Sequence, residues 1–103
     1  MKQFIVSYLG GDHPTDPEAG KQHFEAYQAW IASLGEAAVK PMVPFKNVHC
    51  VNSKATTQGS SVGMSGQTVL QAESIEDALE LVKGCPFLDI NGTLEVAEVV
   101  VMG

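Results

Sequence analysis

The sequence predicts an α+β domain whose strands and helices follow one another in the order β-α-β-β-α-β. Two helical segments begin at good capping residues, extended apolar segments flank each of them, and the second half of the chain repeats the strand–helix–strand pattern of the first. Right-handed crossovers convert this order into the ferredoxin-like sandwich, a four-stranded antiparallel sheet with both helices on one face. We expect the spatial strand order 4-1-3-2.

Length and charge narrow the classes of function. A chain of 103 residues is expected to form a single domain, residues 1–103. The net charge of −6 and the absence of any basic cluster argue against nucleic acid or an anionic membrane as a partner. No apolar run is long enough for a membrane span, and the apolar start is too short and polar for a signal peptide. We therefore expect a cytoplasmic protein.

The first strand is expected over residues 2–9, where side chains alternate between two faces that are both largely apolar. The first helix follows. Asp16 is a suitable N-cap, Pro17 suits the first helical position, and Gly35 suits the C-terminal end. At helical spacing, His23 falls within the apolar stripe, one turn before Tyr27.

The next extended segment, residues 37–45, contains Pro41 and Pro44, which cannot donate hydrogen bonds within a sheet. It is therefore expected at an edge. Residues 46–65 are mainly polar and predict a long, mobile hairpin loop that would act as a lid over a pocket. Residues 48–51 could instead extend the preceding strand.

The second half of the chain begins with a strand over 67–72, opened by Gly66. Ser74 is expected to cap the second helix, with Asp77 as the reciprocal acid of a capping box. The segment 84–86, Gly-Cys-Pro, ends this helix. A turn at 91–92, Asn-Gly, then leads into a Val-rich last strand, expected over 93–102.

Apolar side chains on both faces of the first and last strands predict a dimer. In the last strand, Leu94, Val96, Val100 and Met102 oppose Ala97, Val99 and Val101. Two helices cover only one face of the sheet, and each large apolar side chain left in water would cost about 1.5–3 kcal/mol. The same face of a second copy would cover them, which would give a dimeric α+β barrel.

The candidate chemistry centres on His23, because imidazole suits proton transfer near neutral pH. The alternative is a half-buried structural histidine packed beside Tyr27. Tyr8, Tyr27 and Trp30 would line an aromatic substrate pocket or, alternatively, belong to the core.

Other polar residues are weaker candidates for substrate binding. Asp12 and His13 could approach the start of the first helix, or could simply be loop polarity. Glu95 and Glu98 lie on opposite faces of the last strand, so one of them should point towards a covered side; the alternative is an edge charge that discourages aggregation.

Metals and cofactors are not expected. His13, His23 and His49 lack the spacing of a metal site, and the glycine-rich segments lack the pattern of a phosphate-binding loop. Cys50 and Cys85 also lack metal spacing and are expected to be reduced, buried thiols; a disulfide or a reactive thiol is the alternative.

The chain resembles the YCII-related family, including its DGPF-type branch. The resemblance rests on residues 65–78, 84–87 and 92–96, and more weakly on Tyr27, Trp30, Leu34 and Gly35. It implies a ferredoxin-like chain that pairs into a dimeric α+β barrel. In the family, a first-helix histidine and an aspartate in an Asp-Pro-aromatic motif have suggested an enzyme, and some relatives act on small aromatic or halogenated compounds. His23 falls near the histidine position, whereas Cys85 precedes Pro86 here and the DGPF motif is absent.

These observations leave three functions open. The first, which the resemblance favours, is a cofactor-free enzyme that acts on a small organic, aromatic substrate through His23. The second is a protein that binds a small molecule without chemistry in the same pocket. The third is a module whose only role is dimerisation, which a filled interior near His23 would favour.

Overall fold

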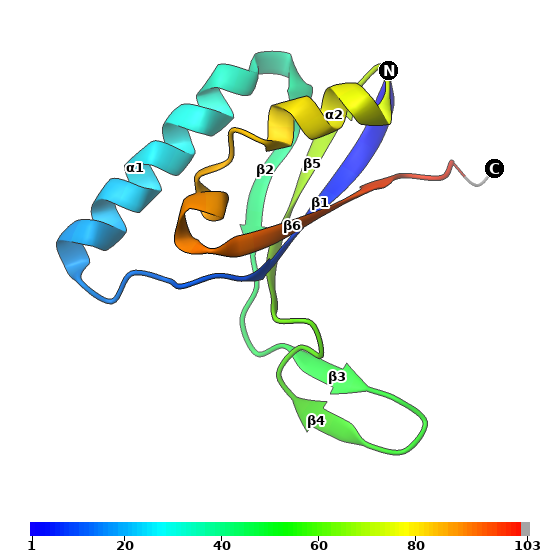
Figure 1. The fold of residues 1–103 in the computed structure, drawn as a ribbon. Helices are drawn as coiled ribbons and strands as arrows, with labels where there is room; N and C mark the ends of the chain where they lie inside the picture. Colours follow the sequence, from blue (N-terminus) through cyan, green and yellow to red (C-terminus); the bar gives the residue numbers. More distant parts are fainter. Residues whose placement is uncertain (102–103) are drawn as a thin grey trace.

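The computed structural model describes residues 1–101 and has the predicted α+β architecture. Its elements are β1 (Lys2–Gly10), α1 (Pro17–Leu34), β2 (Ala38–Pro44), β3 (His49–Val51), β4 (Thr56–Gln58), β5 (Met64–Ala72), α2 (Ile75–Val82) and β6 (Gly92–Glu98). Short 3-10 helices cover Gly35–Ala37 and Pro86–Ile90. The main sheet has the order β2-β5-β1-β6 with every neighbouring pair antiparallel, which confirms the predicted strand order and the ferredoxin-like fold (Figure 1).

The core lies between the sheet and the two helices. Phe4, Val6 and Tyr8 of β1 are fully buried on this face, while Ile5 and Ser7 between them point to the opposite face and are half-buried. Residues from both helices pack on the same side of β1. One cluster joins Val6, Tyr8 and Leu70 to Trp30 of α1 and Val82 of α2. The alternation of β1 therefore places both helices on one face, as expected.

The first helix has the predicted ends. The Asp16 carboxylate accepts a hydrogen bond from the Ala19 amide at 3.2 Å, and Gly35 takes a positive φ of 56° at the other end. Trp30 is the buried residue of this helix, and its indole N–H donates to the Leu81 carbonyl at 3.1 Å. This bond ties the last turns of α1 to the end of α2.

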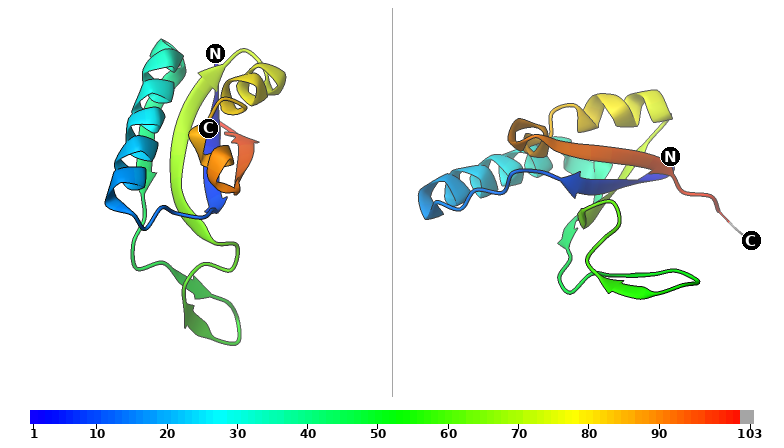
Figure 2. Two further views of the ribbon diagram at one scale, coloured as in Figure 1. Left: turned by 60° about the vertical axis from the view of Figure 1, so that its left-hand side comes forward. Right: turned by 60° about the horizontal axis from the view of Figure 1, so that its bottom comes forward.

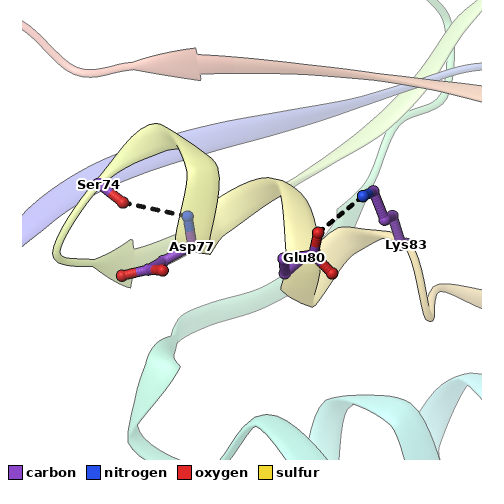
Figure 3. A network of polar contacts seen from close by, with 4 residues as sticks. All are labelled: Ser74, Asp77, Glu80 and Lys83. Carbon is purple, nitrogen blue, oxygen red and sulfur yellow. Dashed lines mark hydrogen bonds and ion pairs between the residues drawn. The ribbon is translucent and has the colours of Figure 1, made fainter.

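The second helix begins at Ser74, also as predicted. The Ser74 hydroxyl accepts a hydrogen bond from the Asp77 amide at 3.2 Å (Figure 3). Within the described residues, the Asp77 carboxylate makes no return bond to Ser74, so only half of the expected capping box forms. One turn later, Lys83 pairs with Glu80 at 2.7 Å, but both side chains are mainly exposed and the pair contributes little stability.

Replacing Ser74 with alanine is expected to lower the free energy of unfolding by about 1 kcal/mol, because an amide at the start of α2 loses its acceptor. Urea denaturation followed by circular dichroism measures this change. Ser53→Ala is the control, since Ser53 is exposed in the turn between β3 and β4. Equal losses for the two variants would contradict the capping role.

The segment 46–65 differs from the prediction. Residues 48–51 do not extend β2; His49–Val51 instead pairs with Thr56–Gln58 in a separate two-stranded ribbon, which projects beyond the end of the sheet (Figure 1). The positive φ of Asn47 redirects the chain after β2, and the Gly59 amide donates to the Val48 carbonyl at 2.6 Å to close the ribbon base. Strand β5 consequently begins at Met64, two residues before Gly66.

The last strand is shorter than predicted, because it ends at Glu98 instead of continuing to residue 102. Glu98 pairs with Phe4, and the Val99 amide still donates to the Gln3 carbonyl at 2.9 Å. Pairing with β1 is therefore seen up to Val99, although β1 itself extends to Lys2. Val100 and Val101 are 78% and 91% exposed, and Met102 lies outside the described residues.

The sheet face away from the helices is mixed in character. Ile5 of β1 lies opposite Val69 of β5, and both are half-buried. Leu9 is only 8% exposed. Ser7, Gln67 and Glu95 lie among them on the same face. This open face is therefore less uniformly apolar than the sequence predicted, because Val99 and Val101, which would continue it, lie beyond the end of β6. Among the described residues, no helix has both the length and the apolar character to span a membrane.

Candidate functional site

A cleft of about 410 Å³ opens on the helix side of the sheet, between α1, β2 and the 3-10 helix at 86–90. Most of its wall is aromatic or apolar, with two histidines on one side. The lining residues are Tyr8, His13, Gly20, His23, Phe24, Tyr27, Met42, Pro44 and Phe87. A volume of this size suits a single-ring ligand, since small-molecule sites typically start at about 300 Å³.

The structure gathers four of the proposed site residues at this cleft: Tyr8, His13, His23 and Tyr27. They come from separate elements. Tyr8 lies near the end of β1, His13 follows in the loop, and His23 and Tyr27 occupy successive turns of α1. The His13 ring is 6.0 Å from the Phe87 ring, centroid to centroid, and the two planes are tilted by 48°.

Three other residues that the sequence proposed for substrate binding lie elsewhere. Trp30 continues the stripe of α1 but is 7% exposed and packs in the core, where its indole bonds to Leu81. Asp12 is exposed and accepts a hydrogen bond from the Asn91 amide at 2.8 Å. Glu95 is exposed on the open face, opposite Ser7. None of the three lines the cleft.

Three hydroxyl groups form a closed triangle between strands and helix. The Tyr8 and Tyr27 oxygens are 2.8 Å apart, and the Thr68 hydroxyl lies 2.8 Å from Tyr8 and 3.1 Å from Tyr27. Thr68 is a fully buried polar residue of β5. Sequence reasoning missed its role, although it is a lone hydroxyl among apolar residues such as Leu70 and Ala72 on one strand face.

Burial keeps these groups uncharged. Desolvation raises the pKa of both Tyr8 and Tyr27 above the ordinary value for tyrosine, and the hydrogen bond with Thr68 only partly opposes this. Both phenols therefore remain protonated around neutral pH. Tyr8 is fully buried, so only the half-buried Tyr27 can offer its hydroxyl to a ligand in the cleft.

Cys85 occupies the position before Pro86 and is 2% exposed within the same core cluster as Tyr8. Burial raises the pKa of its thiol, while the Phe87 backbone and Tyr8 lower it to a smaller extent. A neutral thiol cannot stabilise a histidine cation in the way that the aspartate implied by the resemblance would. Any proton-transfer role of His23 must therefore operate without a carboxylate at this position.

The free energy of unfolding is expected to fall as the pH rises above about 10, because Tyr8 and Tyr27 then lose their protons in the unfolded chain but keep them in the folded one. Below that pH, the contribution of the two protonated phenols to the free energy of unfolding is fully present. Urea denaturation at a series of alkaline pH values measures the slope. Tyr8→Phe removes one titrating group and should flatten it; a wild-type slope no steeper than that of the variant would contradict this account.

The cleft contains no evident metal site. The part of the chain that the structure describes has no group of three or more His, Cys, Asp or Glu side chains placed to hold an ion. His49 lies on the ribbon, where its Nδ1 atom is 2.8 Å from the Asn47 carbonyl oxygen, and not with His13 and His23 at the cleft.

The expected lid is also absent from the cleft wall. No residue of the segment 46–65 lines it within the described chain, because the ribbon runs outward past the end of the sheet (Figure 2). Only Pro44, at the end of β2 before the ribbon, contributes to the wall.

Comparisons with known proteins bear on the fold. No family model matches the chain. No curated protein matches it either. Among solved structures, it resembles 5-chloro-2-hydroxyhydroquinone dehydrochlorinase from Burkholderia phenoliruptrix AC1100, determined in complex with 2,5-dihydroxybenzoquinone. The match has a TM-score of 0.56 and 15% identity, and covers 92% of this chain and 90% of that one. The two proteins share the ferredoxin-like fold over nearly their whole length.

Proposed function

We propose that this chain is a cofactor-free enzyme that binds a small aromatic compound in the cleft and moves a proton on it through His23. The observation that carries the proposal is the meeting of His13 and His23 with the paired phenols in one aromatic cleft. A flat ring would pack against Phe24 and Phe87, and oxygen substituents would face the phenols and imidazoles.

Elimination is the reaction class that suits these groups best. His23 would take a proton from the substrate, and the leaving group would depart with the electrons of its bond to carbon. Chloride is such a leaving group. The Tyr27 hydroxyl would donate a hydrogen bond to negative charge that develops on a substrate oxygen, which a neutral, partly desolvated phenol can do.

The structural neighbour supports this substrate class, because its name describes a dehydrochlorinase of a hydroquinone and its ligand is a dihydroxybenzoquinone. Its shared fold also supports the resemblance to the YCII-related superfamily; membership of the DGPF-type branch is part of the proposal. As part of the same proposal, the chain is a cytoplasmic homodimer that pairs through the open face, where Ile5, Leu9 and Val69 would be covered.

Two measurements test the proposal. Isothermal titration with 2,5-dihydroxybenzoquinone is expected to show binding, and backbone amide NMR shifts should concentrate at residues around the cleft, such as His23 and Tyr27. Chloride release from 5-chloro-2-hydroxyhydroquinone is expected to exceed the rate without protein. Absence of both binding and chloride release would reject the proposal for this substrate class.

A non-catalytic binding protein is the second candidate, and one observation favours it. The neutral thiol of Cys85 stands where the resemblance implies a carboxylate, and the three hydroxyls already satisfy one another. Binding of 2,5-dihydroxybenzoquinone without chloride release would assign this function. The third hypothesis, a module for dimerisation alone, predicts a filled interior beside His23, in contrast to the cleft found there.

A further inference from the structure

A second hollow, of about 380 Å³, runs along the outer side of α1 against β2. Its lining residues are Phe24, Tyr27, Gln28, Ile31, Ala32, Pro41 and Met42. Three of these, Phe24, Tyr27 and Met42, also line the cleft. The two hollows therefore share part of their walls. We call the second one the groove; His23 does not line it.

We propose that the ligand of the cleft carries an apolar substituent, an alkyl chain or a second ring, that lies in this groove. The inference rests on the proposed function, since it places the aromatic head group beside His23. It adds a specificity site formed by Ile31, Ala32 and Pro41, none of which belongs to the cleft itself.

The chemistry of the groove selects an apolar occupant. No charged side chain lines it, and its polar groups are the Gln28 amide and the Tyr27 hydroxyl, which bonds to Tyr8 and Thr68. The β2 side offers little to a polar group, because Pro41 has no amide N–H. The pairing of β2 with β5 is irregular between Lys40 and Val43, and within that irregular stretch Met42 lies at both the groove and the cleft.

Phe24 lines both the cleft and the groove. It is 59% exposed, although it lies one turn before the half-buried Tyr27 on α1. A large apolar ring in water is unfavourable, and a substituent that crosses from cleft to groove would cover it. A ligand that occupies both hollows at once would therefore cover the most apolar surface of Phe24.

Two probes with the same head group test the inference: 2,5-dihydroxybenzoquinone and 2,5-dihydroxy-3-undecyl-1,4-benzoquinone. Isothermal titration should show that the alkylated compound binds at least about tenfold more tightly, which corresponds to about 1.4 kcal/mol. Its alkyl chain should shift the backbone amides of Ile31 and Ala32 in NMR spectra, which the unsubstituted compound leaves unchanged.

A pair of tryptophan variants distinguishes binding in this groove from non-specific hydrophobic binding of the alkyl chain. Ala32→Trp fills the groove and should abolish the tenfold gain while leaving the binding of 2,5-dihydroxybenzoquinone unchanged. Ala26→Trp is the matched control, because Ala26 is also exposed on α1 but lines neither hollow. It should retain the gain. Equal affinity of the two probes, or a gain that survives Ala32→Trp, would overturn the inference.

The outcomes also separate this inference from the proposed function. Binding of 2,5-dihydroxybenzoquinone without any gain in affinity from the alkyl chain leaves the proposed function intact and overturns the groove inference.

If neither quinone binds, the proposed function fails, and hexylbenzene then tests the groove alone. Shifts at Ile31 and Ala32 that hexylbenzene causes and Ala32→Trp removes would support it, and their absence would overturn it. Shifts that follow protein concentration alone would assign the groove to a second copy and also overturn it.

Discussion

Replacing Phe87 with alanine is expected to lower the free energy of unfolding by about 3–5 kcal/mol, because a fully packed ring would leave a cavity. Phe87 is 3% exposed, and its ring meets that of Tyr8 edge to face, with centroids 5.2 Å apart. Two glycines surround it. A Cβ atom on Gly92 would lie 2.2 Å from the ring, and one on Gly11 would lie 2.9 Å from it.

Urea denaturation of the wild type and Phe87→Ala measures this loss. Phe45→Ala provides a matched control, because Phe45 is 38% exposed just after β2 and should cost far less. Phe87 also forms part of the cleft wall. The same variant should therefore bind 2,5-dihydroxybenzoquinone more weakly. Similar stability losses at positions 87 and 45 would show that Phe87 does not hold the core together.

Replacing His23 with alanine is expected to lower kcat/KM for chloride release by about 10²–10⁴-fold, the usual contribution of a general acid or base. The titration with 2,5-dihydroxybenzoquinone should show a much smaller change, because aromatic packing and the phenols would still hold the ring. Free imidazole added to the His23→Ala protein should restore part of the rate, since the space left by the side chain opens onto the cleft.

His49→Ala is the control for the loss of an imidazole, because His49 lies on the ribbon and should leave turnover unchanged. Unchanged turnover in His23→Ala would remove the catalytic role assigned to this residue. A rate loss that imidazole does not rescue, with an equal loss of binding, would assign His23 to positioning the ligand.

The helix ends and the edge strand could be predicted because local chemistry sets them. Asp16, Gly35 and Ser74 act on backbone groups within one helical turn, and each lies where the sequence places it. The ribbon and the length of β6 depend instead on remote backbone. A polar run such as 46–65 can form either a free loop or a paired ribbon, and the length of β6 is set by how far it pairs with β1.

The site was partly predictable for a related reason. His23 and Tyr27 lie one turn apart on α1, so their meeting at the cleft follows from helical spacing. Trp30 continues the same stripe, but α2 covers that end of α1 and turns the position into core. The role of Thr68 could not be assigned from the sequence, because its hydroxyl bonds to two phenols that come from β1 and α1.

The two free thiols differ sharply in access, since Cys50 is half-exposed on the ribbon whereas Cys85 is 2% exposed in the core. Maleimide reagents require an accessible thiolate, so they will attach at Cys50 and spare Cys85, whose pKa burial raises. The unaltered chain thus carries one accessible thiol at which a spin label or fluorophore can report on the ribbon.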